Sequence, residues 1–367
     1  MSEISAAIGF NLIVISPTIA LVGTALVLLF FTITIESNEI VKKSITFLGM
    51  LITSFCVFLK FGLFFENGIS SYFTQKILLD EFSLFGNVLI SLILLFNFLP
   101  IWDSSKQLKE KTTEAIILTL MSASGFMLMV DSENLIMLFI GLEIGSISLY
   151  ALAGLNRGDK LSNEASLKYF LLGSLASCIL IYGVSLIYVS FSVFSVYNFA
   201  LGIAYVGPDS VPLTTSIGVL LIFIGLLFKI AAAPFQSWAP DVYQGSPTGY
   251  VGFMSSIAKV SSFIVIARLC LVSINFIIED FNIFFLIVII SSALIGSLFA
   301  SIQEDLKRLL AYSGVVQSGF ILSGIVSGIN GTSASMFYLF TYILQLIGIF
   351  IIFSIINGKL SSEFNIQ

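Results

Sequence analysis

The sequence predicts an all-α polytopic membrane protein with about eleven transmembrane helices. Of its 367 residues, 57% are hydrophobic and only 10% are charged, which is too apolar a balance for a water-soluble domain. Apolar runs about as long as the hydrocarbon core of a bilayer recur along the whole chain. A transmembrane β-barrel would instead show segments of about 10 residues that alternate in polarity. The run VLISLILLF at 88–96 does not alternate, so a barrel is excluded.

Apolar runs and the polar breaks between them define the predicted spans. In chain order these are residues 8–31, 44–65, 82–100, 113–130, 134–155, 164–190, 213–233, 248–273, 281–302, 308–329 and 333–357. The N-terminal run has neither the basic start and cleavage site of a signal peptide nor the Arg-rich pattern of a transit peptide. We therefore expect the first span to be retained in the mature protein.

The charged residues of the loops predict an orientation. Lysine and arginine gather in the odd-numbered loops, namely at Lys42, Lys43, Lys106, Lys109, Lys111, Arg157, Lys160, Lys307 and Arg308. Acidic residues gather in the even-numbered loops, namely at Glu66, Asp80, Glu81, Asp131, Glu133, Asp209, Glu279 and Asp280. Because inner loops are rich in Lys and Arg, the N-terminus is expected outside and the C-terminus inside. Lys60, Lys76 and Arg268 depart from this pattern.

Four ionisable residues lie well inside predicted spans: Glu143, Lys168, Lys229 and Lys259. Each costs on the order of 3 kcal/mol at the bilayer centre, so such residues mark functional paths or hold helices together. Snorkelling of a lysine to the interface is the structural alternative. It fits Lys259 poorly, because this residue is about 11 residues, or roughly 16 Å, from the start of its span.

The stretch GLEIG predicts the helix face from which Glu143 projects. Gly141 and Gly145 share one face of a helix, and Glu143 projects from the opposite face. The glycines can pack closely against a neighbouring helix and leave the carboxylate facing a polar path. Because a medium of low dielectric disfavours the charged forms of carboxylates and amines alike, a carboxylate and lysines in series are suited to passing protons.

The stretch FKIAAAPFQSWAPDVYQG at 228–245 predicts a broken helix beside Lys229. Pro234 has no N–H for the carbonyl of Ile230, so that acceptor is freed next to the lysine. Broken helices at membrane depth line cavities or are buried in protein, and transporters use them to hold ions. The lysine and the break are expected to form one hydrated site. The alternative is a kink that only helps packing, with Lys229 reaching the inner surface.

Several classes of function are excluded by composition. The chain has no histidine, so histidine-ligated haem or metal and any triad that needs imidazole are ruled out. It has no GxGxxG or Walker motif and no basic stripe for nucleic acid. We expect no cofactor-binding residue, no metal site and no nucleic-acid partner, and we expect contact with membrane lipids.

The residues resemble one known family, the antiporter-like membrane subunits of proton-pumping NADH:quinone oxidoreductase (respiratory complex I), of the subunit 2 or subunit N type. Four stretches carry the resemblance, namely LFIGLEIGSISLYALAGLNR at 138–157, SNEASLKYFLLGSLASCILIYGVSLIY at 162–188, GLLFKIAAAPFQSWAPDVYQGSPT at 225–248 and KRLLAYSGVVQSGF at 307–320. Together they cover most of residues 130–330.

The resemblance implies a role for each buried charge. Glu143 would be the coupling carboxylate, and Lys168 would be a proton site whose proton affinity changes with its distance from Glu143. Lys229 would be the central relay at the broken seventh helix, and Lys259 the next carrier. Glu164, four residues before Lys168, is placed to pair with it locally.

The chain departs from the family pattern in two ways. Gln236 and Gln317 stand where the family usually has histidine, and glutamine cannot titrate. The family also has about fourteen helices with two inverted repeats. The resemblance therefore predicts helices 1–3 at 1–112, a first antiporter-like repeat at 113–273 and an incomplete second repeat at 274–367. It implies that a separate polypeptide or neighbouring subunits supply the missing helices.

The resemblance implies a proton-translocating membrane-arm subunit of the NADH:ubiquinone reductase, with no redox site of its own. FMN, iron–sulfur clusters and ubiquinone are expected in other subunits, and the other membrane-arm subunits are the expected partners. The alternatives are a subunit of a multi-subunit cation/proton antiporter and a non-pumping structural member of the membrane arm. The expected location is the mitochondrial inner membrane, with the chain encoded in the organelle, or else a bacterial plasma membrane.

Overall fold

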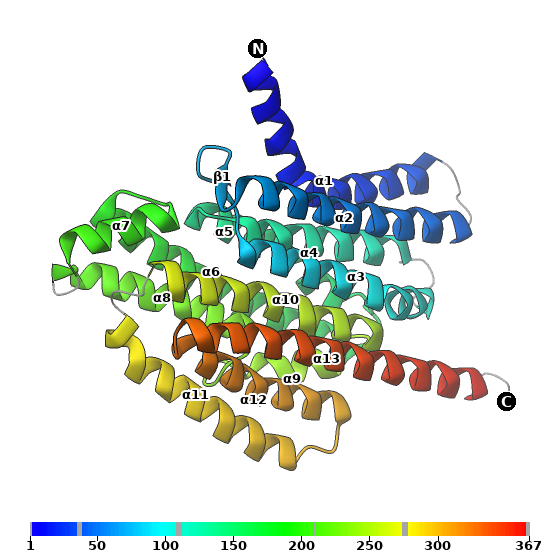
Figure 1. Cartoon of the computed structure of the whole chain (residues 1–367). Coiled ribbons are helices and arrows are strands. Elements are labelled where there is room, and N and C mark those ends of the chain that lie inside the picture. The colour runs from blue at the N-terminus through cyan, green and yellow to red at the C-terminus, as the bar shows by residue number, and fades with distance from the viewer. Residues whose placement is uncertain (1, 35–38, 108–111, 208–209, 274–277, 365–367) are drawn as a thin grey trace.

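The computed structural model describes residues 2–34, 39–107, 112–207, 210–273 and 278–364 (Figure 1). Apart from the connections between its elements, the described chain is helical except for one small hairpin. Its helices are α1 Ser2–Thr34, α2 Glu39–Asn67, α3 Glu81–Gln107, α4 Thr112–Asp131, α5 Leu135–Ala153, α6 Lys160–Phe191, α7 Val196–Val206, α8 Leu213–Lys229, α9 Trp238–Gly245, α10 Thr248–Arg268, α11 Ile278–Ser301, α12 Leu306–Val326 and α13 Ile329–Phe364. A π-helical turn, η3, covers Leu269–Ser273.

The spans of the described chain confirm the predicted fold class. Ten helices are long and apolar enough to cross a membrane: α1 to α6 and α10 to α13. The remaining predicted span, residues 213–233, is α8, which has only 17 residues and ends at Lys229. After an interruption around Pro234 the chain resumes as the short helix α9. The predicted broken seventh helix is therefore confirmed.

Two outer segments that were expected to be loops are structured. Residues 191–212 contain α7, which is capped by Ser195 and is 11 residues long, too short to appear as a span. Between α2 and α3 the strands β1 Ser70–Tyr72 and β2 Ile77–Leu79 pair antiparallel, with Ser70 opposite Leu79. Hydropathy alone cannot find such short elements, because neither presents an apolar run of membrane length.

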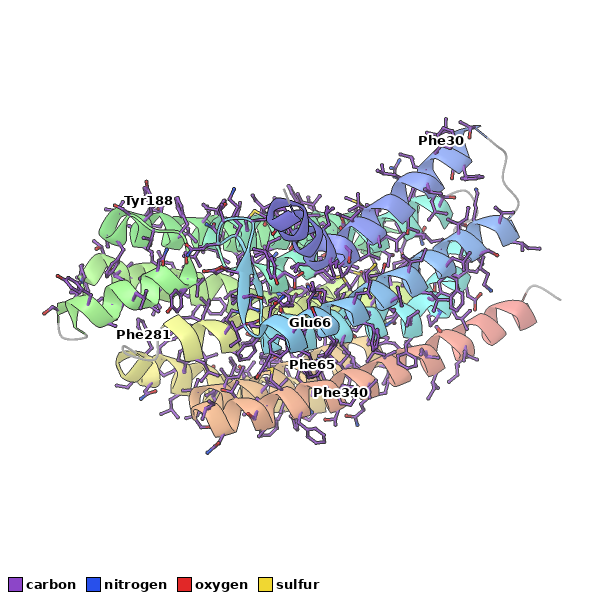
Figure 2. All side chains as sticks on the ribbon, turned by 45° about the horizontal axis from the view of Figure 1, so that its top comes forward. Phe30, Phe65, Glu66, Tyr188, Phe281 and Phe340 are labelled. Atoms are coloured by element: carbon purple, nitrogen blue, oxygen red, sulfur yellow. The ribbon has the colours of Figure 1, made fainter. Side chains whose placement is uncertain are left out.

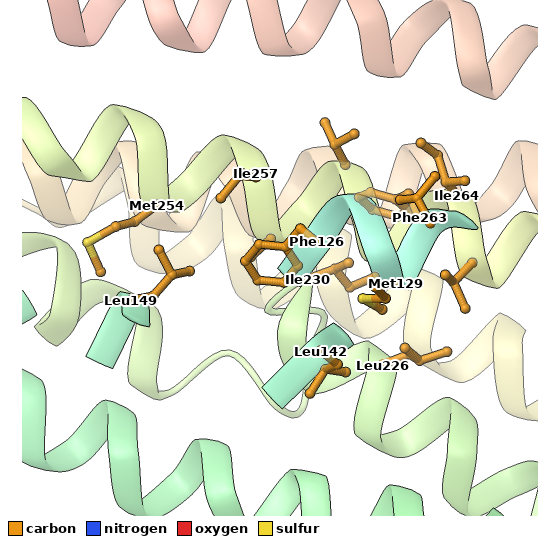
Figure 3. Packing of buried hydrophobic residues seen from close by; sticks show 14 of the residues in the cluster. Phe126, Met129, Leu142, Leu149, Leu226, Ile230, Met254, Ile257, Phe263 and Ile264 are labelled. Atoms are coloured by element: carbon orange, nitrogen blue, oxygen red, sulfur yellow. The ribbon is translucent and has the colours of Figure 1, made fainter. Parts of the chain in front are cut away.

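Helix α10 is the centre of the bundle. All of its residues from Gly249 to Arg268 are buried, and it packs against α3, α4, α5, α8 and α13. An apolar helix with no polar face is expected to lie inside a protein. Figure 3 shows buried side chains of α4, α5, α8 and α10 meeting around Phe126, Ile230 and Ile257.

The outer helices present apolar side chains to the surroundings. Phe30, Phe65 and Tyr188 are exposed and point outward in Figure 2. Such a surface suits contact with lipid chains rather than water. The chain is therefore a multi-pass membrane protein.

Helix α1 contains Pro17, and its first turns point away from the bundle in Figure 1. A proline inside a helix leaves the carbonyl four residues earlier without its backbone partner. Here that carbonyl belongs to Ile13, and the hydroxyl of Ser16 donates to it over 2.7 Å. A proline-freed carbonyl is thus paired by a serine from the same turn.

Helices α4 and α5 touch through glycine, as the GLEIG stretch predicts. A Cβ atom added to Gly141 would lie 2.5 Å from the backbone nitrogen of Met129, and one added to Gly125 would lie 2.3 Å from the backbone nitrogen of Gly145. These distances are too short for any side chain. The close contact fixes which face of α5 turns away from α4, and Glu143 lies on that face.

We expect Gly141→Ala to destabilise the fold by about 1–3 kcal/mol, because the added methyl group forces two backbones apart. The measurement is the thermal unfolding midpoint of the purified protein. Gly62→Ala is the matched control, since no atom lies within 4 Å of a Cβ added there. Equal midpoints for the two variants would contradict the close contact between α4 and α5.

Candidate functional site

The helix break after α8 is held together by serines of the C-terminal helices. The carbonyl of Ile230, which Pro234 cannot pair, accepts a hydrogen bond of 2.8 Å from the Ser318 hydroxyl of α12. The prediction of a freed acceptor beside Lys229 is therefore confirmed, and its partner is a tertiary one. In α11, Ser292 accepts from the Ala233 N–H over 2.9 Å, and Ser291 donates to the Ala233 carbonyl over 3.1 Å.

The break is buried. Ala231, Ala232 and Ala233 are at most 1% exposed, and Ala231 has a φ of +54°, a left-handed conformation that is unusual for alanine. The Trp238 indole donates to the carbonyl of Phe228, which closes the connection between α8 and α9. Irregular backbone at membrane depth is tolerated where it is enclosed by protein, and this break meets that condition.

Lys229 points from the break toward α5. Its side-chain nitrogen Nζ donates to the Ser146 hydroxyl over 2.9 Å and to the Tyr150 hydroxyl over 2.8 Å, and the residue is 2% exposed. Glu143, Ser146 and Tyr150 follow the i, i+3, i+7 spacing of one helix face. The carboxylate of Glu143 interacts electrostatically with Lys229. One carboxyl oxygen of Glu143, Oε1, is buried and has no hydrogen-bond partner.

Lys259 lies in the middle of α10, where it is 3% exposed. Its Nζ donates to the Gly314 carbonyl over 2.5 Å and to the Ser318 hydroxyl over 3.3 Å, and it lies 5.5 Å from the ring centre of Tyr342. A Cβ on Gly314 would come within 2.7 Å of that nitrogen, so a side chain there would displace the ammonium group from its present position. Snorkelling is therefore excluded for Lys259, and the burial of Lys229 excludes it there too.

Lys168 has a different environment from the other two lysines. Its side chain is 41% exposed and forms ion pairs with Glu164 over 2.6 Å and with Asp241 of α9 over 2.7 Å. The predicted local pair with Glu164 is confirmed. The pairing with Glu143 that the resemblance implies stays a prediction: the two carboxylates paired with Lys168 are Glu164, one turn earlier in α6, and Asp241 of α9.

Asp241 connects three helices, α6, α9 and α12, on the side that the loop charges predict to be inner. Besides Lys168 it pairs with Arg308 of α12 over 2.7 Å, and Arg308 also donates to Gln244 and Gln303. We call Lys168, Glu164, Asp241 and Arg308 the inner ion network. It fixes the orientation of α9, and hence the inner end of the break, relative to α6 and α12.

The two glutamines at usual histidine positions differ in their contacts. Tyr338 of α13 donates to the side-chain oxygen of Gln317. The side-chain oxygen of Gln236 is buried and has no partner. Neither side chain can take up or release a proton. Any proton transfer between the lysines must therefore avoid both positions.

Buried ion pairs near the outer ends of the helices explain two exceptions to the charge pattern of the loops. Lys60 of α2 donates to both carboxylate oxygens of Asp131 over 2.8 and 2.9 Å. Arg268 of α10 binds both carboxylate oxygens of Asp80 over 2.6 and 2.9 Å. These outer ion pairs join residues 71 and 188 positions apart in the chain, so sequence spacing gave no sign of them. Lys76, the third exception, is exposed.

Glu133 lies in the outer connection between α4 and α5 and is 3% exposed. The Ser195 hydroxyl donates to one of its carboxyl oxygens over 3.1 Å, and the other has no partner. Burial raises the pKa of this carboxyl group above the ordinary value for glutamate. Glu133 therefore holds a proton more readily than an exposed glutamate does.

Comparison with known sequences finds relatives among the membrane subunits of quinone oxidoreductases. Residues 132–367 match the family model described as NADH:quinone oxidoreductase/Mrp antiporter, TM. NADH-quinone oxidoreductase subunit N of Trichlorobacter lovleyi is 37% identical over 293 residues, which are 79% of this chain and 59% of that protein. NAD(P)H-quinone oxidoreductase subunit 2 from the chloroplast of Mesostigma viride is 35% identical over 285 residues, which are 76% of this chain and 57% of that protein.

Solved structures are similar over nearly the whole chain. A chain of respiratory complex I from Thermus thermophilus superposes with a TM-score of 0.76 and 27% identity, covering 92% of this chain and 70% of that one. A chain of the Mrp complex from Dietzia has a TM-score of 0.81 but only 19% identity, covering 94% of this chain and 65% of that one, and so shows a shared fold alone. The chain spans 59% of the length of the Trichlorobacter protein.

Proposed function

Because the chain belongs to the NADH:quinone oxidoreductase and Mrp antiporter family of membrane subunits, we propose that it translocates protons as a membrane-arm subunit of a NADH:quinone oxidoreductase. The observation that carries the proposal is the pair of buried lysines on either side of one helix break. Lys229 and Lys259 are each bound only by neutral oxygen atoms among the hydrogen bonds of the described residues.

Each buried charge has a place in the proposed path. Glu143 is the coupling carboxylate, because it lies on the same face of α5 as Ser146 and Tyr150, the two residues that bind Lys229. Lys229 is the central relay, and Lys259 is the next carrier. Lys168 connects the path to the inner side through Asp241. Lys259 is held by a carbonyl and a hydroxyl group, so it can release its proton without leaving behind an unpaired buried carboxylate, which suits a carrier.

The proposed role needs no redox group in this chain. Flavin, iron–sulfur clusters and quinone would act in other subunits. The free energy of quinone reduction would reach this chain as changes in electric field and in conformation. Glu143, with one carboxyl oxygen free of hydrogen bonds, is suited to sense such a change. The proposed location is an energy-coupling membrane, either the inner membrane of a mitochondrion or the plasma membrane of a bacterium.

We expect Lys259→Ala to lower proton translocation by this subunit more than it lowers assembly of the complex. The substitution removes the only proton carrier on α10 that faces α12 among the described residues, while neighbouring apolar side chains can still pack. The measurement is the number of protons moved per NADH oxidised in proteoliposomes, normalised to assembled complex. If the variant lowers proton translocation and assembly to the same extent, Lys259 has a structural role.

A cation/proton antiporter is the second candidate. The family model supports it, because its description covers both kinds of protein. Purification under native conditions separates the two. Co-purification with flavin and iron–sulfur subunits and NADH dehydrogenase activity favours the oxidoreductase, and cation-dependent proton exchange without these subunits favours the antiporter.

The partners proposed for this chain are the other membrane-arm subunits. A separate polypeptide that supplies further helices stays a prediction. Mass spectrometry of every small membrane subunit in the purified complex tests it. A second polypeptide with a lysine on a proline-broken helix would support a divided subunit, and pumping by a complex without one would contradict it.

A further inference from the structure

One hydroxyl group, that of Ser318, lies between the two buried lysines. It is 2.8 Å from the carbonyl of Ile230, the residue after Lys229, and 2.8 Å from the carbonyl of Gly314. The ammonium group of Lys259 is 3.3 Å away. Ser318 is completely buried, so no solvent competes for these contacts. It is the link between the break on one side and the α10 lysine on the other.

The single proton of the hydroxyl group cannot serve both carbonyls. A serine hydroxyl has one donor and two acceptor sites. Lys259, when charged, itself donates to the Gly314 carbonyl over 2.5 Å and to the Ser318 oxygen. The Ser318 proton is then directed to the Ile230 carbonyl. A charged Lys259 thus pairs the Gly314 carbonyl and leaves the hydroxyl proton for the Ile230 carbonyl.

We propose that Ser318 is a positioning residue that couples the charge state of Lys259 to the helix break beside Lys229. When Lys259 has given up its proton, its nitrogen has a lone pair and accepts from the Ser318 hydroxyl. The Ile230 carbonyl then loses its partner. Ser318 keeps its own proton throughout, so no covalent step is required of it. The inference rests on the proposed function, in which both lysines carry protons.

The consequence for Lys229 follows from chain geometry. Ile230 is the residue directly after Lys229 and forms the end of α8. A buried carbonyl without a donor costs about 1–3 kcal/mol, which favours a rearrangement of the break that finds another donor. That rearrangement alters the direction from which Lys229 meets Ser146 and Tyr150. The two lysines are thus coupled although no direct contact between them is needed.

A comparison within the chain indicates why the source of the serine matters. The carbonyl freed by Pro17 in α1 is paired by Ser16, a neighbour in the same helix. The carbonyl freed by Pro234 is paired by a serine 88 positions away, on a helix that also contacts Lys259. A serine in the same helix only stabilises the bend. A serine from another helix can couple the hydrogen bonding of the break to a change in that other helix.

The test is a double-variant cycle on the complete complex in proteoliposomes. The readout is protons translocated per NADH oxidised, normalised to assembled complex. Ser318→Ala is expected to lower coupled translocation by this subunit roughly 10-fold, the loss expected for one hydrogen bond to a charged group. In a Lys259→Gln background, where no charge change can be transmitted, the same substitution is expected to add less than about 2-fold.

Ser323→Ala is the matched control, because this serine lies on the same helix but is exposed, and its hydroxyl donates to the Phe320 carbonyl one turn earlier. It is expected to pump normally. Multiplied losses in the double variant overturn the inference, since a purely structural role acts independently of the charge on Lys259. Ser318→Thr keeps the hydroxyl, and a threonine variant that assembles but retains less than half of the wild-type ratio overturns it as well.

The cycle also separates this inference from the proposed function. Normal pumping by Lys259→Gln and by a Lys229 variant would refute the proton path itself. Loss of pumping in those variants together with normal pumping by Ser318→Ala would leave the path intact and refute only the coupling through Ser318.

Discussion

Lys229→Met is expected to reduce proton translocation by this subunit by roughly 100-fold while the complex still assembles, because general acid–base groups contribute at least this much to proton transfer. Methionine fills the buried space of the lysine stem and leaves the Ser146 and Tyr150 hydroxyls free to bond with each other or with α5 carbonyls. The measurement is the initial rate of proton translocation in proteoliposomes at a fixed rate of NADH oxidation.

Lys229→Arg separates a relay from a charge that only holds helices together. Arginine keeps a positive charge near Glu143 but does not release its proton in proteins. We expect Lys229→Arg to fail in pumping as Lys229→Met does. Recovery of pumping in the arginine variant would mean that Lys229 contributes charge alone, and the relay role would be wrong.

Arg268→Ala is expected to destabilise the protein by about 3–5 kcal/mol, because it leaves the carboxylate of Asp80 buried without its cation. Asp80 is 6% exposed, and Arg268 also pairs the carbonyls of Val130 and Ser132. Three buried acceptors thus lose their donor together. The loss is measured as a lower thermal unfolding midpoint and a lower yield of assembled complex.

Lys76→Ala is the control for this effect. Lys76 is also a basic residue of an outer connection, but its side chain is exposed, so its removal is expected to change stability by less than about 0.5 kcal/mol. Asp80→Asn in the Arg268→Ala background removes the uncompensated charge and is expected to recover part of the loss. No recovery in that double variant would show that the two carbonyls, and not the ion pair, dominate.

The spans, the break and the close face of α5 were predictable from sequence because each depends on local properties. Membrane spans follow from the length of apolar runs, the break follows from the missing N–H of Pro234, and the α5 contact follows from two glycines four residues apart. In each case the property that determines the structure lies within one helical turn or one span of the sequence. The ionisable residues Glu143, Lys229 and Lys259 were found for the same reason, since a charge inside an apolar run is visible without knowledge of its neighbours.

The partners of these residues could not be predicted, because they come from distant helices. Ser318 and Gly314 are ordinary small residues of α12, and only the fold brings them to Lys259. Asp241 lies between two predicted spans in the sequence, yet it binds Lys168 and Arg308. A partial signal existed for Ser146 and Tyr150, which follow Glu143 at helical spacing. The outer ion pairs gave no such signal.

The serines that pair the break have a consequence for the order in which the chain reaches its final structure. Ser291, Ser292 and Ser318 all emerge from the ribosome after the break that they satisfy. A nascent chain that has inserted only as far as α10 therefore carries unpaired peptide groups at membrane depth, which is unfavourable in lipid. We therefore expect that the predicted repeat at 113–273 does not fold on its own. Its seventh helix is completed only when α11 and α12 arrive, and a protein divided before α12 would depend on the second fragment to close it.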